Sequence, residues 1–353
     1  MEWGGLDCGI GKSCCGMSVI VNRRRVMGGR PKDYFAFEAI EAGTFTPPKD
    51  MEYSLDGFSF VPITAGSVSP TVAAGKKIYW RGNLNAGITG IGQFVPTASY
   101  KVAGNVNSLF YGDNFEGVVT AKGFACLDLF KNDAYICDAS ELVLPFLTPP
   151  RECYEHMFMN CTSLEYPPQL PATDLSNYRV CGDMFNGCTS LKEAPELPST
   201  QLGQWTYNNM FLGCTALTTP PSILPATTLE TGCYADMFKN CINLTIAPTI
   251  SATTLQQRCC QEMFMGCSKL EAAPVLHATT LVSFGCYLSM FNGCTNLKYI
   301  KAMFTDIPAT DCTTNWLKNV ASNGTFVKNS VATWTTTGAN GVPSGWTIEY
   351  ADE

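Results

Sequence analysis

A motif that returns every 26 or 27 residues constrains the fold of this chain more than any other feature. Met-Phe pairs, at intervals of 27, 26, 27, 26 and 27 residues, begin at Met157, Met184, Met210, Met237, Met263 and Met290. A fixed period of this length is typical of solenoids, in which each repeat packs against its neighbours. Less regular copies, Leu129-Phe130 and Trp316-Leu317, flank the series, as expected of terminal repeats.

Each repeat has three recognisable parts. The apolar positions before and at the Met-Phe pair, as in Cys233-Tyr-Ala-Asp-Met237-Phe238, follow one face of a helix. Three residues after the Met comes Gly or Asn, which tolerate left-handed backbone and indicate that a short helix ends there. A Leu and a short extended stretch follow, as in Leu191-Lys-Glu-Ala-Pro195. The pattern predicts a leucine-rich-repeat-like solenoid over residues 126–320, with one short strand and one short helix per repeat.

The remaining sequence predicts three further regions, so the whole chain is expected to be β-rich and multidomain. Residues 1–34 are rich in Gly, with six basic and three acidic side chains, and have too little apolar content to fold alone. Residues 35–125 alternate short apolar stretches with turns, including the hairpin signal Asp56-Gly57, and predict a small β-sandwich-like domain. Residues 321–353 are expected to form a C-terminal cap.

Most of the 18 cysteines follow the repeat. One series lies three or four residues before five of the six repeat Met residues, and a second lies four residues after all six, so their sulfur atoms are expected to stack inside the solenoid as small buried groups. Disulfides between repeats and a zinc site are the disfavoured alternatives, and the chain has no Cys-x-x-Cys pair. Cys8, Cys14 and Cys15 belong to no repeat. For them cross-linking, partner docking and the absence of any role all stay open.

Little in the sequence indicates catalysis. The two histidines, His156 and His277, are interpreted as repeat variants, and His277 replaces the Pro of a Leu-Pro-Ala-Thr turn. Gly9-Ile-Gly11-Lys12-Ser13 matches only the end of a P-loop, because the Gly required five residues before Gly11 is Leu6. No nucleophile, base and orienting group are arranged together. We therefore predict a non-enzymatic protein without a cofactor or metal.

The charge distribution argues against nucleic acid as a partner. The net charge is −7, of which residues 1–34 contribute 6 − 3 = +3 and the remainder −10, whereas nucleic-acid-binding domains are basic. The longest early apolar run, residues 17–21, is far shorter than the about 20 residues of a membrane helix. Basic residues follow this run instead of preceding it. Neither membrane insertion nor a secretion signal is therefore expected.

The repeat unit resembles a known family. Cys-Tyr-x-x-Met-Phe-x-Gly-Cys-Thr-x-Leu-x-x-x-Pro, with Leu-Pro-Ala-Thr-x-Leu, is similar to BspA-type leucine-rich repeats over roughly residues 126–320. Such arrays occur in surface adhesins of gut bacteria and in virion proteins of the bacteriophages that infect them. The tail from Gly324 to Ile348 also resembles the ending of such phage-associated proteins. Without a secretion signal, the resemblance implies a virion surface protein made in the host cytoplasm, with the bacterial cell surface as the alternative location.

These observations lead to a functional hypothesis with two alternatives. The protein is expected to be a tail or head fibre or adhesin that contacts a host surface glycan or protein through its solenoid. The arm would bind other virion proteins, with Arg23, Arg24, Arg25 and Arg30 as candidate anchoring residues, and the β domain would act as a spacer or homotrimerisation unit. The alternatives are a decoration or assembly protein without a receptor and a bacterial adhesin.

The candidate ligand surface consists of the variable residues that directly follow the repeat Leu. Extended columns of this kind form the binding surfaces of solenoids. They are Glu165, Tyr166, Lys192, Glu193, Thr218, Thr219, Thr245, Ile246, Glu271, Ala272, Lys298 and Tyr299. The alternative is that these are simply solvated positions of each repeat.

Overall fold

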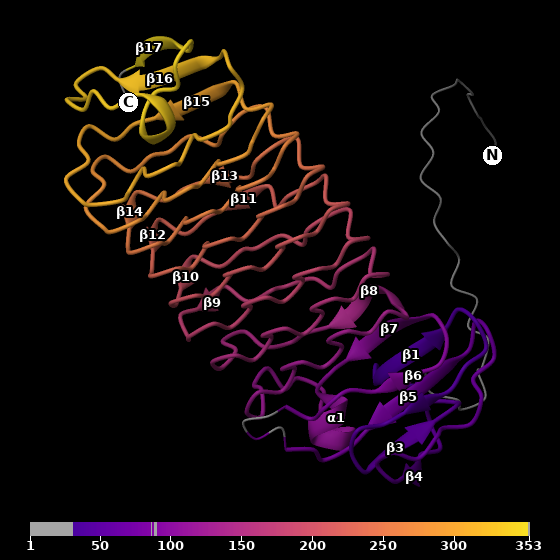
Figure 1. Cartoon of the computed structure of the whole chain (residues 1–353). Helices are drawn as coiled ribbons and strands as arrows, with labels where there is room; N and C mark the ends of the chain where they lie inside the picture. The colour runs from indigo at the N-terminus through magenta and orange to yellow at the C-terminus, as the bar shows by residue number, and fades with distance from the viewer. Residues whose placement is uncertain (1–30, 86, 88–89, 352–353) are drawn as a thin grey trace, which may run out of the picture. The chain divides into compact units, whose positions relative to one another are not determined.

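The strands predicted between residues 35 and 105 form a sheet at one end of the described chain (Figure 1). The computed structural model describes residues 31–85, 87 and 90–351. Six strands lie in the order β4-β3-β5-β1-β7-β8, and all neighbours are antiparallel except the parallel pair β7 and β8. The strands are β1 (Phe35–Ala39), β3 (Met51–Ser54), β4 (Val61–Ile63), β5 (Lys77–Arg81), β7 (Tyr100–Asn105) and β8 (Ile136–Val143).

This region is β-rich, as predicted, but its strands form one mixed sheet rather than two facing sheets of similar size. The second pair, β2 (Phe45–Thr46) and β6 (Val95–Pro96), has only two residues per strand. The larger sheet extends into the repeats because β8 pairs in parallel with β7. One hydrophobic core therefore runs continuously from the sheet into the solenoid.

The hairpin predicted at Asp56-Gly57 is confirmed. Strands β3 and β4 pair antiparallel, and Gly57 has a φ of +77° in the connecting loop. The carboxylate of Asp56 accepts hydrogen bonds from the backbone N–H groups of Phe58 and Ser59, both at 2.8 Å. The connecting loop spans residues 55–60, and the second strand begins at Val61.

From residue 126 on, the chain winds into a stack of parallel coils (Figure 1). Each coil contributes short strands that pair with the next coil in parallel: β9 with β10, β11 with β13, and β12 with β14. Their bounds are β9 (Asp174–Leu175), β10 (Gln201–Leu202), β11 (Ile223–Leu224), β12 (Thr228–Leu229), β13 (Thr249–Ile250) and β14 (Thr254–Leu255). A parallel three-stranded sheet of β15 (Tyr299–Ala302), β16 (Thr325–Asn329) and β17 (Thr347–Ala351) ends the stack. The predicted solenoid is confirmed.

The predicted helix in each repeat is wrong. Helical structure in the described residues is limited to α1 (Ser108–Tyr111) and two 3₁₀ turns, η1 (Gly112–Asn114) and η2 (Gly338–Asn340). None of these lies in the repeats, where tandem turns replace the helices. Among the described residues, no helix is long and apolar enough to span a membrane.

Left-handed residues at every fourth position explain why no helix forms. In one coil Arg179, Asp183 and Gly187 have φ values of +54°, +56° and +76°, whereas an α-helix needs negative φ throughout. N–H groups alternate between the carbonyl three residues back and the next coil: Met184 bonds to Cys181 at 3.3 Å, and the next residue, Phe185, bonds to Met210 at 2.9 Å. The left-handed conformation predicted at the Gly or Asn after each Met-Phe pair is confirmed.

Aromatic rings fill the centre of the solenoid. The Phe of each Met-Phe pair stacks on the Phe of the next coil with centroids 5.1 to 5.6 Å apart and nearly parallel planes. The series consists of Phe130, Phe158, Phe185, Phe211, Phe238, Phe264 and Phe291. Each ring is almost fully buried, so the stack fixes how successive coils align.

The cysteines after the Met-Phe pairs form a second column. Each thiol donates a hydrogen bond of 3.0 to 3.1 Å to the carbonyl of the Phe in the preceding coil. The donors are Cys161, Cys188, Cys214, Cys241, Cys267 and Cys294. All described cysteines are free, and all except the half-buried Cys137 are buried, so the prediction of stacked, unbridged thiols is confirmed.

Candidate functional site

The twelve residues of the candidate ligand surface lie together along one edge of the solenoid. All are exposed except the half-buried Glu165. Backbone contacts join neighbouring coils here: Glu193 forms a parallel bridge with Thr219, and Ala272 forms one with Tyr299. We call this set the variable strip. The structure therefore places these side chains in adjacent columns, as the sequence predicts, and leaves their role as a prediction.

Charged pairs occupy both ends of the variable strip. The ammonium of Lys192 lies 2.7 Å from Glu165 of the preceding coil, and that of Lys298 lies 2.9 Å from Glu271. The hydrogen bond to Glu165 raises the pKa of Lys192. Exposed pairs of this kind add little stability, but they hold the long side chains along the stack. The coils between the pairs carry uncharged residues, so the strip has a neutral centre.

Large apolar side chains of the strip reach into solvent. Tyr166, Ile246 and Tyr299 are 51%, 60% and 40% exposed, although each lies within two residues of a buried repeat position. Aromatic side chains contribute a large share of binding energy at many interfaces, because they offer contact area at a low entropy cost. The strip thus combines two tyrosine rings, hydroxyl groups and charges of both signs.

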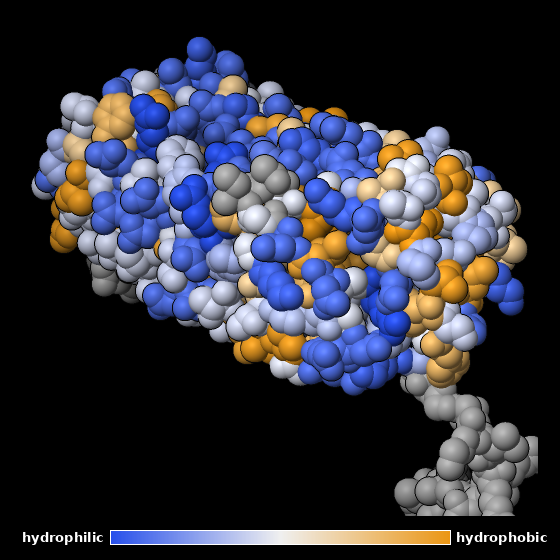
Figure 2. Space-filling view, turned by 90° about the horizontal axis from the view of Figure 1, so that it is seen from below, coloured by the Kyte–Doolittle hydropathy of each residue, from blue (hydrophilic) through white to orange (hydrophobic). Residues whose placement is uncertain are grey.

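The surface elsewhere is largely polar. Figure 2 shows one face of the molecule on which hydrophilic residues predominate and apolar residues gather in small, separate patches. Such scattered patches are normal on a soluble protein and need no partner. Among the described residues, no group of three or more His, Cys, Asp and Glu side chains is placed to hold a metal ion.

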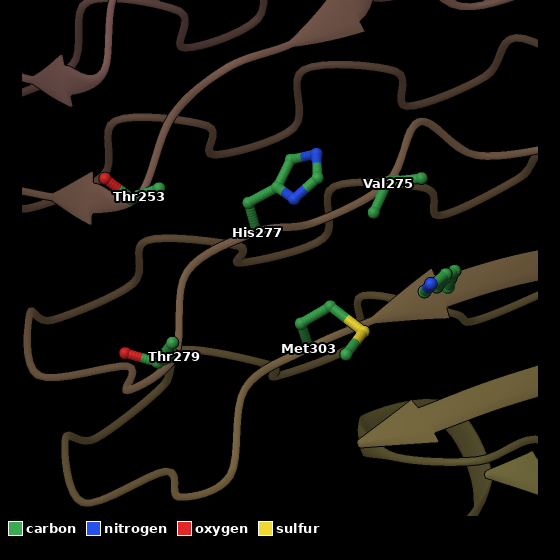
Figure 3. A pocket seen from close by; sticks show the side chains of 6 residues that line it. Thr253, Val275, His277, Thr279 and Met303 are labelled. Atoms are coloured by element: carbon green, nitrogen blue, oxygen red, sulfur yellow. The ribbon is translucent and has the colours of Figure 1, made fainter. Parts of the chain in front are cut away.

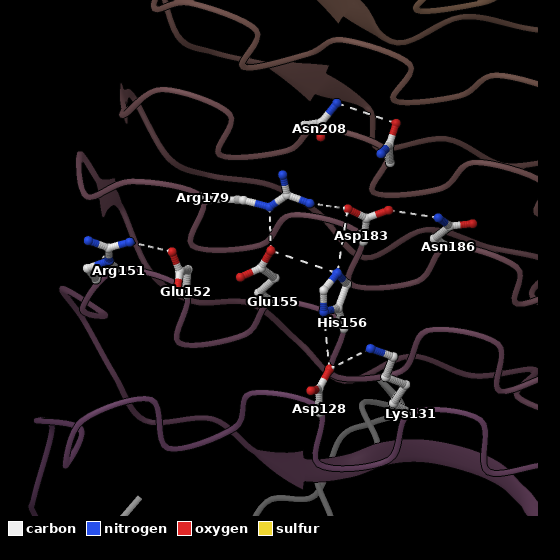
Figure 4. Close-up of polar contacts among 11 residues, drawn as sticks. Asp128, Lys131, Arg151, Glu152, Glu155, His156, Arg179, Asp183, Asn186 and Asn208 are labelled. Carbon is white, nitrogen blue, oxygen red and sulfur yellow. Dashed lines mark hydrogen bonds and ion pairs between the residues drawn. The ribbon is translucent and has the colours of Figure 1, made fainter. Parts of the chain in front are cut away.

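His156 belongs to a network of ionised groups on the turn side of the solenoid (Figure 4). Arg179 contacts both Glu155 and Asp183, the latter at 2.6 Å. The His156 ring lies 3.1 Å from Asp128 through Nδ1, and 3.8 and 3.9 Å from Glu155 and Asp183 through Nε2. Burial raises the pKa of Glu155, against the opposing effect of Arg179.

This network joins three successive coils through contacts among carboxylates, Arg179 and His156. Each carboxylate already faces a cation or the imidazole, which is the usual arrangement of buried structural charges. The interpretation of His156 as a repeat variant therefore fits its surroundings. The other histidine, His277, directly follows Leu276, which pairs with Ala302 of the next coil, and it lines a pocket.

Several other predicted residues lie outside the described part of the chain. They are the anchoring candidates Arg23, Arg24, Arg25 and Arg30, the P-loop-like residues 9–13, and the cysteines Cys8, Cys14 and Cys15. Their roles stay as predictions from sequence.

Comparison with known proteins adds one distant similarity. No protein-family model matches the sequence. No curated protein matches it either. Among solved structures, the chain is similar to the crystal structure of a leucine-rich repeat protein from Bacteroides ovatus, at 14% identity and a TM-score of 0.19, over 66% of this chain and 79% of that chain.

That TM-score is too low to carry an argument, so the assignment rests on the repeats and the hydrogen bonds between coils. The chain is a solenoid of short parallel strands joined by tandem turns.

Proposed function

We propose that this protein is a non-enzymatic surface-binding protein of a bacteriophage virion, a fibre or adhesin that contacts the host cell through the variable strip. One observation carries the proposal: the interior repeats almost unchanged from coil to coil, whereas the strip changes. Six coils place a buried Phe and a hydrogen-bonded Cys at the same two positions. The exposed residues after the repeat Leu share no such constraint, so they are free to match a ligand.

The chemistry of the strip suits a cell-surface glycan or protein. The rings of Tyr166 and Tyr299 can stack on the apolar face of a sugar or on a partner side chain. The hydroxyls of Thr218, Thr219 and Thr245 can exchange hydrogen bonds with polar groups of either ligand. Because the coils stack in parallel, these groups form one extended surface rather than an enclosed pocket.

The virion setting is supported by the resemblance to BspA-type repeats. In this proposal residues 1–34 anchor the protein to other virion proteins, with the arginine-rich segment 23–30 as the contact. Removing residues 1–34 and measuring incorporation into particles tests the anchoring. Unaltered incorporation would contradict it.

The binding role is tested with the full chain carrying Tyr166→Ser, Ile246→Thr and Tyr299→Thr together. Saturable binding of the fluorescently labelled protein is measured on intact gut-bacterial cells and on immobilised glycans. If each side chain contributes at least about 1 kcal/mol, the triple variant should bind at least about a hundredfold more weakly than the unchanged protein.

A matched control removes the same kind of side chain elsewhere. Val68, Val282 and Val331 are 65%, 65% and 71% exposed and lie outside the strip, so a triple Val→Thr variant should bind as the unchanged protein does. Equal losses in both triple variants would contradict a specific role for the strip. Absence of saturable binding by the unchanged protein would instead favour a decoration or assembly protein.

A further inference from the structure

A pocket of about 270 Å³ opens on the strand side of the solenoid, near its C-terminal end. It is formed by side chains of three consecutive coils: Thr253, Val275, His277, Thr279, Lys301 and Met303. In Figure 3 the side chains of His277 and Met303 face the same space from neighbouring coils. None of these residues belongs to the variable strip.

The pocket lies where the Pro of the repeated turn is no longer present. Pro171, Pro198 and Pro225 precede the Ala-Thr or Ser-Thr of their turns, and Ser251, His277 and Met303 take this place in the three coils that follow. One coil further on, Lys301 lies in the column of Val275, because Leu276 pairs with Ala302. The imidazole and the ammonium thereby face the same outer side of the strands.

Neither of these two groups has a partner among the described residues. Elsewhere in the solenoid, Lys192, Lys239 and Lys298 each contact a carboxylate of an adjacent coil. Lys301 has no ion pair and His277 no hydrogen bond in the described chain, and no carboxylate lines the pocket. Lys301 is half-buried and has no anion beside it, so an anionic ligand in the pocket would give it a charged hydrogen-bond partner.

The other lining residues indicate more than a small inorganic anion. The hydroxyl of Thr279 donates to no group of the described chain, so it is free to bond to a ligand, whereas that of Thr253 donates to Thr227 at 3.4 Å. Val275 and the buried Met303 form an apolar wall. Ligand pockets combine an apolar lining with a few convergent polar groups in this way.

We propose that this pocket binds a single carboxylate-bearing sugar residue, of the uronic or sialic acid class. The carboxylate lies between Lys301 and His277, the ring hydroxyls contact the threonines, and the C–H face of the ring packs on Val275 and Met303. The site is independent of the variable strip, so it stands or fails separately from the proposed binding of a cell surface.

The test uses the full chain and four probes: sodium D-glucuronate, N-acetylneuraminate, D-glucose and inorganic phosphate. Binding is followed by ligand-observed NMR and isothermal titration calorimetry at neutral pH. We expect at least one of the two acids to bind saturably in the millimolar range or tighter, with glucose and phosphate at least about tenfold weaker. No saturable binding of either acid, or equal binding of glucose, would overturn the proposal. Phosphate binding as tight as the acids would do so too, by revealing a general anion site.

Two variants locate the binding with residues that other coils carry at the same positions. His277→Pro restores the repeat residue, and Lys301→Val copies Val275; each should weaken binding of the acid at least about tenfold. Lys49→Val, at an exposed lysine far along the chain, is the matched control and should bind normally. If Lys301→Val or His277→Pro melts at a lower temperature than the unchanged protein, Lys301→Gln or His277→Gln, respectively, replaces it. Unchanged binding in folded variants of both positions would refute the site.

Discussion

The stack of phenylalanine rings predicts a graded loss of stability that depends on how many ring neighbours a position has. Phe211 stacks on Phe185 at 5.6 Å and on Phe238 at 5.4 Å. Phe291 ends the series and stacks only on Phe264, at 5.5 Å. Both side chains are fully buried, so they differ in ring contacts and not in exposure. Phe→Leu at the two positions therefore isolates the contribution of one ring pair.

The expected magnitudes follow from two contributions. Replacing a buried Phe by Leu costs about 1 kcal/mol for the change of shape. Each lost ring pair adds about 1 kcal/mol beyond the buried area. Phe291→Leu should then lower the free energy of unfolding by about 2 kcal/mol and Phe211→Leu by about 3 kcal/mol, from the same two sources.

A double variant sharpens the test. Phe185→Leu and Phe211→Leu each remove two ring pairs, but together they remove three, because they share one. The double variant should be about 1 kcal/mol less destabilised than the sum of the two single variants. The free energy of unfolding is measured by urea titration with tryptophan fluorescence. Equal losses at Phe211 and Phe291, together with additive losses in the double variant, would refute the reasoning.

Three further predictions concern the backbone, a buried charge and the thiols. Gly104 has a φ of +75°, and a Cβ there would lie 1.9 Å from a backbone carbonyl oxygen, so Gly104→Ala should cost about 3 kcal/mol or more. Gly117→Ala, at the same φ but with open space around it, should cost only about 1 kcal/mol, and similar melting temperatures for the two variants would contradict the clash. Arg179→Met leaves the buried Glu155 without its cation and beside another carboxylate. The free energy of unfolding at pH 7 should then fall by about 3 kcal/mol. A fall of less than about 1 kcal/mol in urea titration would show that the network does not need the arginine. Burial raises the pKa of Cys267 to about 12 and raises that of other core thiols, whereas unfolded thiols ionise near pH 8.5. The contribution of the buried thiols to stability is therefore complete below about pH 8.5 and is lost as the pH rises towards their folded pKa, by about 1.4 kcal/mol per pH unit and thiol. The urea midpoint should then fall steeply from pH 8 to pH 10. A constant midpoint over this range would contradict the prediction.

The repeating interior could be predicted from sequence because each coil reports it independently. A Cys four residues after the Met of each Met-Phe pair has one place in a coil of 26 or 27 residues, and the structure puts each of these thiols in the same column. The side on which the variable strip lies followed from the same period. Its ligand did not follow, since exposed residues carry no packing constraint that a pattern reveals.

The prediction of a helix in each repeat was wrong because another structure has the same apolar spacing. Apolar residues at positions one, two, five and six fit a helix of 3.6 residues per turn, but they also fit turns that repeat every four residues. The distinguishing signal lies between them, at pairs such as Asp183 and Gly187 or Asn209 and Gly213, which are both left-handed. Asp, Asn and Gly at both positions, four residues apart, indicate tandem turns.

Features that depend on contacts between distant parts of the chain could not be predicted from the sequence. The need for Gly at position 104 comes from Tyr34, which is 70 positions earlier in the chain. The pocket at His277 required the register that brings Lys301 beside Val275. The departure of His277 from the repeat was visible in the sequence, whereas the cation one coil away became meaningful only with this register.

Because every coil offers the next the same ring, thiol and carbonyl, the length of this protein is modular. Loss or gain of one complete repeat would rejoin the phenylalanine stack and the thiol bonds without a mismatch, and would shift the C-terminal end by about one strand spacing of 4.8 Å. A deletion of any other size would break both columns at once. Relatives of this chain should therefore differ in reach by whole coils, and each added coil would contribute two new residues to the variable strip while leaving the N-terminal sheet unchanged.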